Sequence, residues 1–255
     1  MFQALGKSFA RFLSRPRGRG VQFATSGQVE LAAALKKGDV LLLEGNSRIS
    51  SVIKYLTQSS WSHAALFIGD AVGPPPPREE AKVLLEVDIN EGVRAIPLST
   101  YGTRHTRICR PVGLSPEDIN KVVGHAVSRL GHRYDLKNIF DLARDLIPNP
   151  PIPSHWRRLA LSFGSGDPTK AICSSLIAEA FQSVHYPILP EVFLKKSQDP
   201  DSKDVSKEVF HIRHHSLFAP RDFDVSPYFQ IVKPTIEEGF DPGALSWDSA
   251  GDDVR

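Results

Sequence analysis

The chain of 255 residues is long enough for one large domain or two small ones with a sizeable core. Its 41% hydrophobic and 24% charged residues are ordinary for a globular protein, and a formal net charge of +2 gives no argument for nucleic-acid binding. Two cysteines, Cys109 and Cys173, make neither a disulfide framework nor a zinc pattern. We therefore expect no nucleic-acid partner, no metal and no organic cofactor.

Residues 1–29 form a basic N-terminal segment in which Phe2, Leu5 and Phe9 fall on one side of a helix. One hypothesis is a helix that packs on the domain, followed by a flexible Arg/Gly linker. The other is a peripheral membrane contact through residues 1–20, because basic amphipathic helices bind anionic lipid surfaces. No segment has the length of a membrane span, and the start lacks the apolar core of a signal peptide. Because two cysteines without a disulfide framework suit a reducing compartment, we expect a cytoplasmic protein, with peripheral membrane association as the alternative.

The remainder of the chain alternates between strand and helix patterns up to about residue 233, and an acidic tail over 234–255 is expected to be disordered. Helix spacing, capping residues and period-two alternation predict most of the elements. The predicted helices cover residues 46–56, 115–130, 136–147 and 170–184, and the predicted strands cover 63–69, 83–89, 96–98, 106–110 and 229–232. The segment 195–207 is polar and is expected to be exposed.

The strand that begins near His63 places this imidazole on the same face as Ala65 and Phe67, because side chains alternate along a strand. In the next strand, Glu86 and Asp88 share a mostly apolar neighbourhood and therefore need a partner or water. An imidazole on a neighbouring antiparallel strand supplies such a partner, and the carboxylate would then fix its tautomer. Glu86, nearer the middle of its strand, is the favoured residue, with Asp88 as the rival. A structural histidine and a solvated acidic face remain the alternatives.

Cys173 falls at the start of an apolar helix, just after a loop marked by Gly164, Gly166 and Pro168. Unpaired N–H groups and the helix dipole favour a thiolate there, and a thiolate is a nucleophile whose neighbouring amides can hold an oxyanion. The competing interpretation is a small apolar residue in the core, since free cysteine is often buried.

Four blocks of sequence, taken together and in this order, resemble the permuted papain-like hydrolases, the YiiX/YebB-like branch of the NlpC-type superfamily. The blocks are Leu35–Leu43, Thr57–Gly69, Leu85–Val87 with Gly92–Leu98, and Gly131–Asp135 with Ile172–Ile177. The resemblance implies an α+β, circularly permuted papain-like fold over residues 30–233. In that fold a curled antiparallel sheet packs against helices that include the nucleophile helix, and the helix start is expected to meet the face that bears His63.

For the site, the resemblance implies that Cys173 is the nucleophile, His63 the base and Glu86 the orienting group. It also places Tyr134 near the pocket, and we expect Trp61 and Ser62, next to His63, to contact the substrate. The implied activity is hydrolysis of an amide bond in a small-molecule or peptide substrate, such as a peptidoglycan fragment, through a thioester. The alternatives are a lipid acyltransferase or lipase at a membrane surface, and a binding module that has lost activity.

Overall fold

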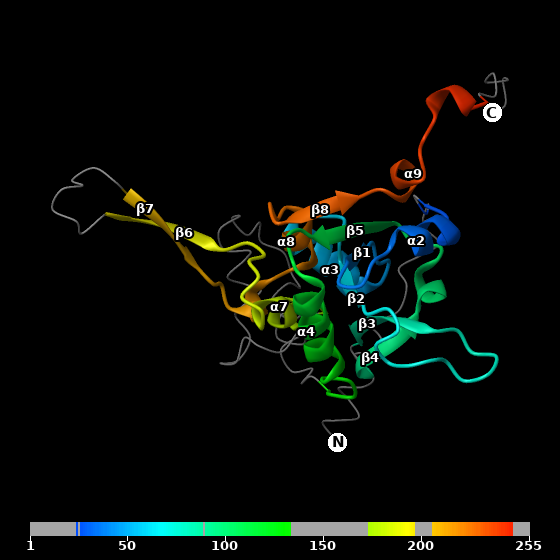
Figure 1. Cartoon of the computed structure of the whole chain (residues 1–255), viewed down its shortest axis with the longest axis horizontal. Coiled ribbons are helices and arrows are strands. Elements are labelled where there is room, and N and C mark those ends of the chain that lie inside the picture. The colour runs from blue at the N-terminus through cyan, green and yellow to red at the C-terminus, as the bar shows by residue number, and fades with distance from the viewer. Residues whose placement is uncertain (1–23, 25, 89, 134–172, 197–205, 247–255) are drawn as a thin grey trace.

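The computed structural model describes residues 24, 26–88, 90–133, 173–196 and 206–246 (Figure 1). Within these ranges a mixed α/β fold is built around one antiparallel sheet, as the sequence predicts. The helices are α2 (Gln28–Ala34), α3 (Arg48–Thr57), α4 (Pro116–Val127), α7 (Cys173–Gln182), α8 (Pro220–Asp224) and α9 (Pro234–Glu237), with 3-10 turns η1 (Leu98–Tyr101), η2 (His215–Leu217) and η3 (Pro242–Ala244). The strands are β1 (Val40–Leu43), β2 (His63–Phe67), β3 (Lys82–Asp88), β4 (Gly92–Pro97), β5 (Thr106–Pro111), β6 (Glu191–Lys196), β7 (Ser206–His211) and β8 (Phe229–Val232).

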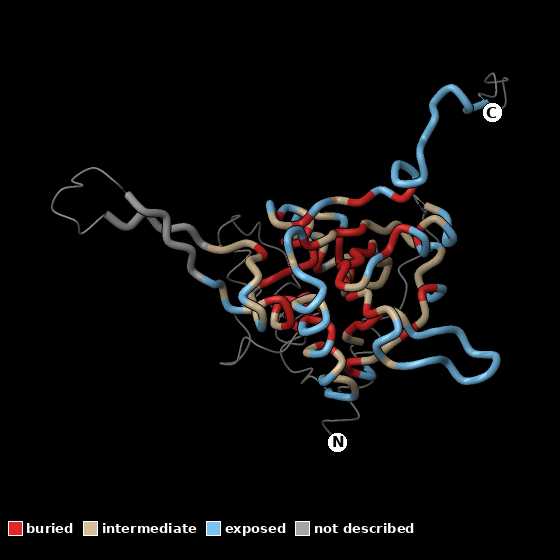
Figure 2. Tube along the Cα trace, in the orientation of Figure 1, coloured by how far each residue is buried: buried red, intermediate tan, exposed pale blue. Residues whose placement is uncertain are grey.

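The main sheet has six strands in the order β4-β3-β2-β1-β5-β8 and is not closed into a barrel. All of its neighbouring strands are antiparallel. Strand β1 lies near the middle, and its four residues Val40–Leu43 are all buried because both faces of the sheet are covered. The sheet therefore separates two apolar layers, which appear as the red interior of Figure 2.

The first layer of the core lies between the sheet and helices α4 and α7, and it includes Val40, Leu66 and Leu176. The second lies on the other face, where α2 and η1 cover Leu41 and Leu84. Adjacent residues of one strand enter different layers, as the period of two requires. Burying apolar groups on both faces holds the strand ends in fixed positions, and the candidate site lies at one of these ends.

The helix starts follow the capping rules that predicted them. Before α3 the hydroxyl of Ser47 accepts a hydrogen bond from the Ser50 N–H at 3.1 Å. Before α4 the hydroxyl of Ser115 accepts one from the Asp118 N–H at 3.1 Å, and Pro116 occupies the first turn. The predicted helix at 136–147 lies outside the described residues.

Two segments contain elements that the sequence did not predict. The region 195–207, expected to be polar and exposed, contains parts of the paired strands β6 and β7, which project from the body in Figure 1. The tail expected to be disordered from residue 234 begins with α9 and also contains η3. Pro234 is buried at the start of α9, and its fixed φ suits the first turn of a helix. Residues 1–23 and 247–255 lie outside the described part of the chain, so the predicted membrane segment remains a prediction.

A buried ion pair joins the start of β1 to β5. The guanidinium of Arg110 donates to both carboxylate oxygens of Asp39, at 2.9 and 2.7 Å, and to the carbonyl oxygen of Ala34. The side chain of Asp39 is only 1% exposed. Burial raises the pKa of Asp39, whereas the hydrogen bond from Arg110 lowers it. A carboxylate in this position depends on Arg110 for its solvation.

We predict that Arg110→Ala lowers the free energy of unfolding by about 3 kcal/mol, because it leaves a buried carboxylate without its ionic partner. Chemical denaturation measures this loss. The matched control is Lys121→Ala, whose side chain is 56% exposed and paired only with surface acids; we expect it to change stability by less than about 0.5 kcal/mol. Equal effects of the two substitutions would contradict the role given to Arg110.

Candidate active site

Cys173 lies at the beginning of α7 as the structure describes this helix, and it is 4% exposed. The next residue anchors the same turn, because the hydroxyl of Ser174 donates to the carbonyl oxygen of Phe218 at 2.7 Å. Farther along α7, Leu176 and Phe181 are buried against the sheet and α4. The apolar stripe that predicted the helix therefore also fixes where its cysteine is placed.

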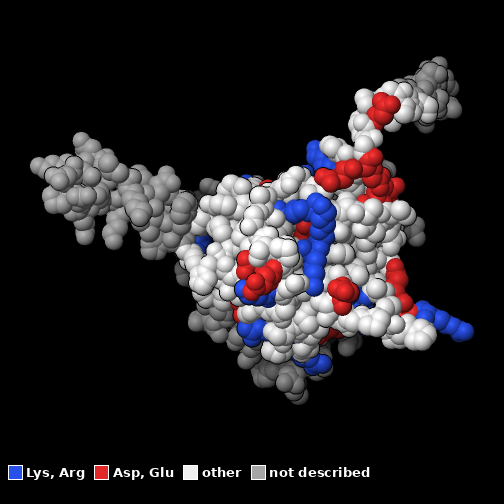
Figure 3. Space-filling view, in the orientation of Figure 1, with Lys and Arg blue, Asp and Glu red and all other residues white. Residues whose placement is uncertain are grey.

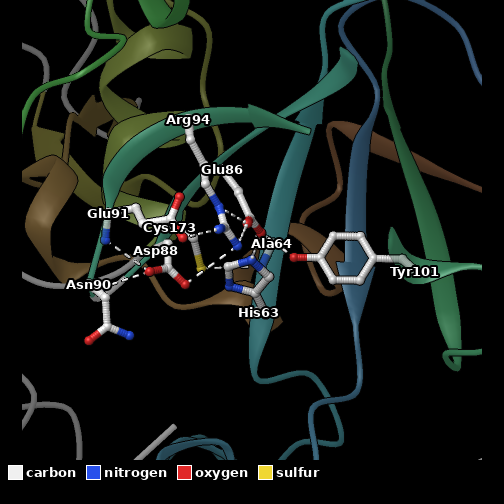
Figure 4. Close-up of polar contacts among 9 residues, drawn as sticks. All are labelled: His63, Ala64, Glu86, Asp88, Asn90, Glu91, Arg94, Tyr101 and Cys173. Carbon is white, nitrogen blue, oxygen red and sulfur yellow. Dashed lines mark hydrogen bonds and ion pairs between the residues drawn. The ribbon is translucent and has the colours of Figure 1, made fainter. Parts of the chain in front are cut away.

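The sulfur of Cys173 accepts a hydrogen bond from the backbone N–H of Ala64 at 3.2 Å (Figure 4). This N–H is available because the ladder between β2 and β3 pairs only Leu66 and Phe67 with their partners. The N–H of Ile68 donates to the carbonyl oxygen of Val83 in β3. Because N–H groups alternate in direction along a strand, those of residues 64 and 66 also face β3. At Ala64 the two strands have parted, and the cysteine sulfur takes the place of a backbone acceptor.

This arrangement corrects the expected packing of the nucleophile helix. Ala64 and Leu66 belong to the core layer beneath α7, whereas Ala65 lies in the layer on the opposite face. His63 falls on the Ala65 face by alternation. Helix α7 therefore does not lie over the face that bears His63, and the sulfur reaches the imidazole through the opening between β2 and β3.

His63 is held by a carboxylate from the neighbouring strand. Its Nε2 lies 2.6 Å from Oε2 of Glu86, whose side chain is 1% exposed. Because Nε2 faces Glu86, Nδ1 is the ring nitrogen left for the sulfur. The structure thus brings together the three residues that the sequence singled out: Cys173, His63 and Glu86. Figure 4 shows all three close together, where β2 and β3 separate.

Glu86 also accepts hydrogen bonds from two residues that sequence reasoning did not select. Arg94 on β4 donates from Nε at 2.8 Å and from a terminal nitrogen at 2.7 Å, both to Oε1. The hydroxyl of Tyr101, in η1, donates to Oε2, the oxygen that also binds His63. In the sequence Arg94 appears only within one of the family motifs. Its pairing with Glu86 across β3 and β4 depends on the strand register, which the sequence does not reveal. Tyr101 gave no sequence signal.

The pKa values of the pair follow from these contacts. Burial opposes protonation of His63, but the negative charge of Cys173, the hydrogen bonds with Cys173 and Glu86, and the charge of Glu86 raise its pKa well above the usual 6.5. For Glu86, burial opposes ionisation, yet the hydrogen bonds from His63 and Tyr101 and the charges of His63 and Arg94 lower its pKa to about 2. The site therefore favours a charged imidazole next to a charged carboxylate.

Asp88, the rival to Glu86, has other partners. Its Oδ1 accepts hydrogen bonds from the N–H groups of Asn90 and Glu91, at 2.7 and 3.0 Å, and so closes the turn between β3 and β4. Its Oδ2 lies 3.5 Å from Arg94. The observed contact of His63 is thus with Glu86, the favoured alternative.

Ser62 and Trp61, expected to contact the substrate, are each 3% exposed. The hydroxyl of Ser62 accepts a hydrogen bond from the N–H of Gly45 at 2.8 Å. The indole of Trp61 donates to Asp224 at 2.9 Å and stacks on His105. These contacts fix the loop that leads into His63. A substrate contact for either side chain stays a prediction.

Tyr134 lies outside the described residues, but the segment that leads to it is placed. The N–H of Val93 donates to the carbonyl oxygen of His132, and the N–H of Gly131 donates to the carbonyl oxygen of Val93. Gly92 has a φ of +81°, and a Cβ there would collide with the His132 carbonyl oxygen. Residues 131–133 therefore run beside β4, close to the turn that carries Asp88.

The described residues also bear on two other features, a metal site and a membrane-spanning helix. Among the residues that the structure describes, no group of three or more His, Cys, Asp or Glu side chains could hold a metal ion. None of the helices in the described ranges is long and apolar enough to cross a membrane. Cys109 is fully buried in the core.

Comparison with known proteins supports the resemblance drawn from the motifs. Residues 34–144 match the family of permuted papain-like amidase enzymes, YaeF/YiiX. The resemblance to this family is confirmed. The matched range contains His63, Glu86, Arg94 and Tyr101, and it ends before Cys173. Cys173 lies outside the matched range, so its assignment to the site rests on the contact of its sulfur with the N–H of Ala64.

Among solved structures, the chain is similar to the crystal structure of metalloprotein yiiX from Escherichia coli O157:H7. The identity is 16%, the TM-score is 0.42, and the alignment covers 78% of this chain and 97% of that one. No curated protein sequence matches the chain. The family is one of papain-like amidases, which supports a cysteine hydrolase of the amidase type.

The lowered pKa of Glu86 predicts a pH-dependent contribution to stability. The contribution is complete above the usual pKa of 4.5 and is lost as the pH falls through about 2. Relative to Glu86→Gln, which does not titrate, the wild type should lose about 2 kcal/mol of unfolding free energy between about pH 6 and about pH 3. Urea denaturation at several pH values measures the difference. Parallel pH profiles of the two proteins would show that Glu86 is not held as a carboxylate.

Proposed function

We propose that the protein is a cysteine amidase in which Cys173 is the nucleophile, His63 the acid and base, and Glu86 the orienting group. The single observation that carries this proposal is the placement of the Cys173 sulfur on the N–H of Ala64, next to His63, whose ring is held by the buried carboxylate of Glu86. A nucleophile, its base and a third group that orients the base are the parts that covalent acyl transfer needs. The match to an amidase family supports the same chemistry.

The reaction begins with attack of the Cys173 sulfur on the amide carbonyl carbon. The carbonyl π electrons move to oxygen, and the resulting oxyanion is held by the backbone N–H of Cys173, at the positive end of the helix. His63 then gives its proton to the leaving nitrogen, the C–N bond breaks, and an amine departs from a thioester. Water, deprotonated by His63, attacks the thioester and releases a carboxylic acid and the thiolate.

In the resting state the N–H of Ala64 has a separate role. It donates to the sulfur at 3.2 Å from a strand edge where no backbone acceptor is placed. A hydrogen bond to a charged acceptor is stronger than one between neutral groups. This N–H therefore supports the charged form of Cys173 before substrate binds, together with the protonated ring of His63.

We propose an amide in a peptide or peptidoglycan fragment as the substrate. The support is the match to a family of amidases, together with the resemblance to NlpC-type enzymes in the sequence motifs. Transfer of the acyl group to an acceptor other than water uses the same thioester and differs only in its last step. The residues expected to contact lipid, 1–20, lie outside the described part of the chain.

The test is hydrolysis of a muropeptide and of an acyl p-nitroanilide, with mass spectrometry of acid-quenched protein. We predict an acyl adduct on the peptide that contains Cys173, and a loss of at least about 10³-fold in kcat/KM for Cys173→Ala. The matched control is Cys109→Ala, which removes the other thiol from the core and should retain activity. An acyl adduct on a residue other than Cys173, or full activity in Cys173→Ala, would contradict the proposal.

A further inference from the structure

The carboxylate of Glu86 binds donors on both of its oxygens. Oε1 is taken by two nitrogens of Arg94, at 2.8 and 2.7 Å, and Oε2 is shared between Nε2 of His63 and the hydroxyl of Tyr101. The donors come from three elements, β2, β4 and η1, and they approach from different sides in Figure 4. Only one of the three, His63, takes part in the reaction proposed above.

A carboxylate that orients a catalytic imidazole has two competing effects. It holds the ring in place, and it also increases the affinity of the ring for its proton. An acid that must protonate a leaving amine works best when its pKa lies near the working pH. A fully buried carboxylate with His63 as its only partner would hold the proton too strongly for this task.

We propose that Tyr101 and Arg94 are positioning residues that fix Glu86 from its two sides and weaken its hold on the His63 proton. This inference rests on the proposed function, because it assigns these residues to the proton transfer of the same site. Each donor draws part of the carboxylate charge toward itself, so less of that charge acts on the imidazole. Each also prevents rotation of the carboxylate away from Nε2.

The surroundings of Tyr101 fit a permanent donor. Burial and the charge of Glu86 raise the pKa of its phenol, so the hydroxyl stays protonated over the whole range in which His63 titrates. The ring lies edge-on to His63, with centroids 6.1 Å apart. The Tyr101 hydroxyl therefore directs its proton at the oxygen that binds Nε2.

Arg94 supplies the positive charge that faces the carboxylate of Glu86. Its side chain is 30% exposed and also lies 3.0 Å from Glu91 and 3.5 Å from Asp88, acids of the β3–β4 turn. These outer acids neutralise part of the guanidinium charge and hold the side chain in reach of Glu86. Arg94 thus links the buried carboxylate to the turn at the edge of the sheet.

The experiment is an NMR titration of the His63 ring, with its signal assigned by comparison with His63→Gln. We expect the pKa of His63 to rise by at least about half a pH unit in Tyr101→Phe and in Arg94→Gln, because each substitution removes a group that opposes the imidazolium charge. Tyr101→Phe keeps the aromatic ring in the core. A residue with a merely structural role would leave the titration of His63 unchanged.

Each variant has a matched control. Tyr186→Phe removes a hydroxyl that donates to the carbonyl oxygen of Val112, from a ring packed on the core layer opposite to that of Tyr101. Arg129→Gln removes a guanidinium that is 38% exposed and paired with Glu179 at 2.6 Å. Both controls should leave the pKa of His63 unchanged. Thermal unfolding is used to check that all four variants are folded.

A kinetic readout separates proton donation from overall damage. Anilides need a proton on the leaving nitrogen, whereas p-nitrophenyl esters have a leaving group that departs unprotonated. We therefore expect Tyr101→Phe and Arg94→Gln to lose at least about tenfold more kcat on an acyl p-nitroanilide than on the matching p-nitrophenyl ester.

The two levels of the proposal fail in different ways. A His63 pKa that is unchanged or lower in both folded variants would overturn the roles of Tyr101 and Arg94, whatever the activity. A raised pKa in a protein that forms no adduct at Cys173 would leave those roles standing and overturn the amidase proposal instead.

Discussion

The contact on which the site depends is the 2.6 Å approach of His63 to the buried carboxylate of Glu86, on adjacent strands of one sheet. A carboxylate that is 1% exposed costs much free energy unless charged donors surround it. Here the imidazole and a guanidinium are those donors, and the negative charge of Cys173 adds to the field that keeps the imidazole protonated. The folding energy of the sheet is thereby coupled to the charge state of the site.

The fold places this contact where two strands separate. Core layers on both faces hold β1 and β2 in register, while the ladder between β2 and β3 ends at Leu66 and Leu85. The opening admits the start of α7 from one face, and Glu86 approaches His63 from the other. Because the site is built at this opening, the sulfur can approach the imidazole from one core layer and the carboxylate from the other.

Charge is distributed unevenly over the molecule. Acidic side chains gather over α9 and the residues that follow it, and the body carries both basic and acidic side chains (Figure 3). The acidic end lies away from the labelled β3–β4 region that carries Arg94, Asp88 and Glu86. The field at Cys173 is therefore set mainly by its immediate neighbours, since surface charges are screened over about 10 Å.

Local sequence signals predicted what depends on local chemistry. Period-two alternation located the strands of His63 and Glu86, and Ser47 and Ser115 marked helix starts that the structure contains. The choice of Glu86 over Asp88 followed from position within a strand. What the sequence could not supply was register and layer: which face α7 covers, where β2 and β3 part, and which hydroxyl from η1 reaches Glu86. Such pairings join residues far apart in the chain, so no spacing rule encodes them.

The most direct test of this account is the rate at which iodoacetamide alkylates Cys173 at about pH 6, in the wild type and in His63→Gln. At this pH an ordinary thiol is almost entirely protonated, so fast alkylation requires a sulfur anion stabilised by the imidazolium. The account predicts that the substitution lowers the rate at least about tenfold, with Cys173 identified by mass spectrometry. Equal, slow rates in the two proteins would show that sulfur and imidazole do not form an ion pair, and would contradict it.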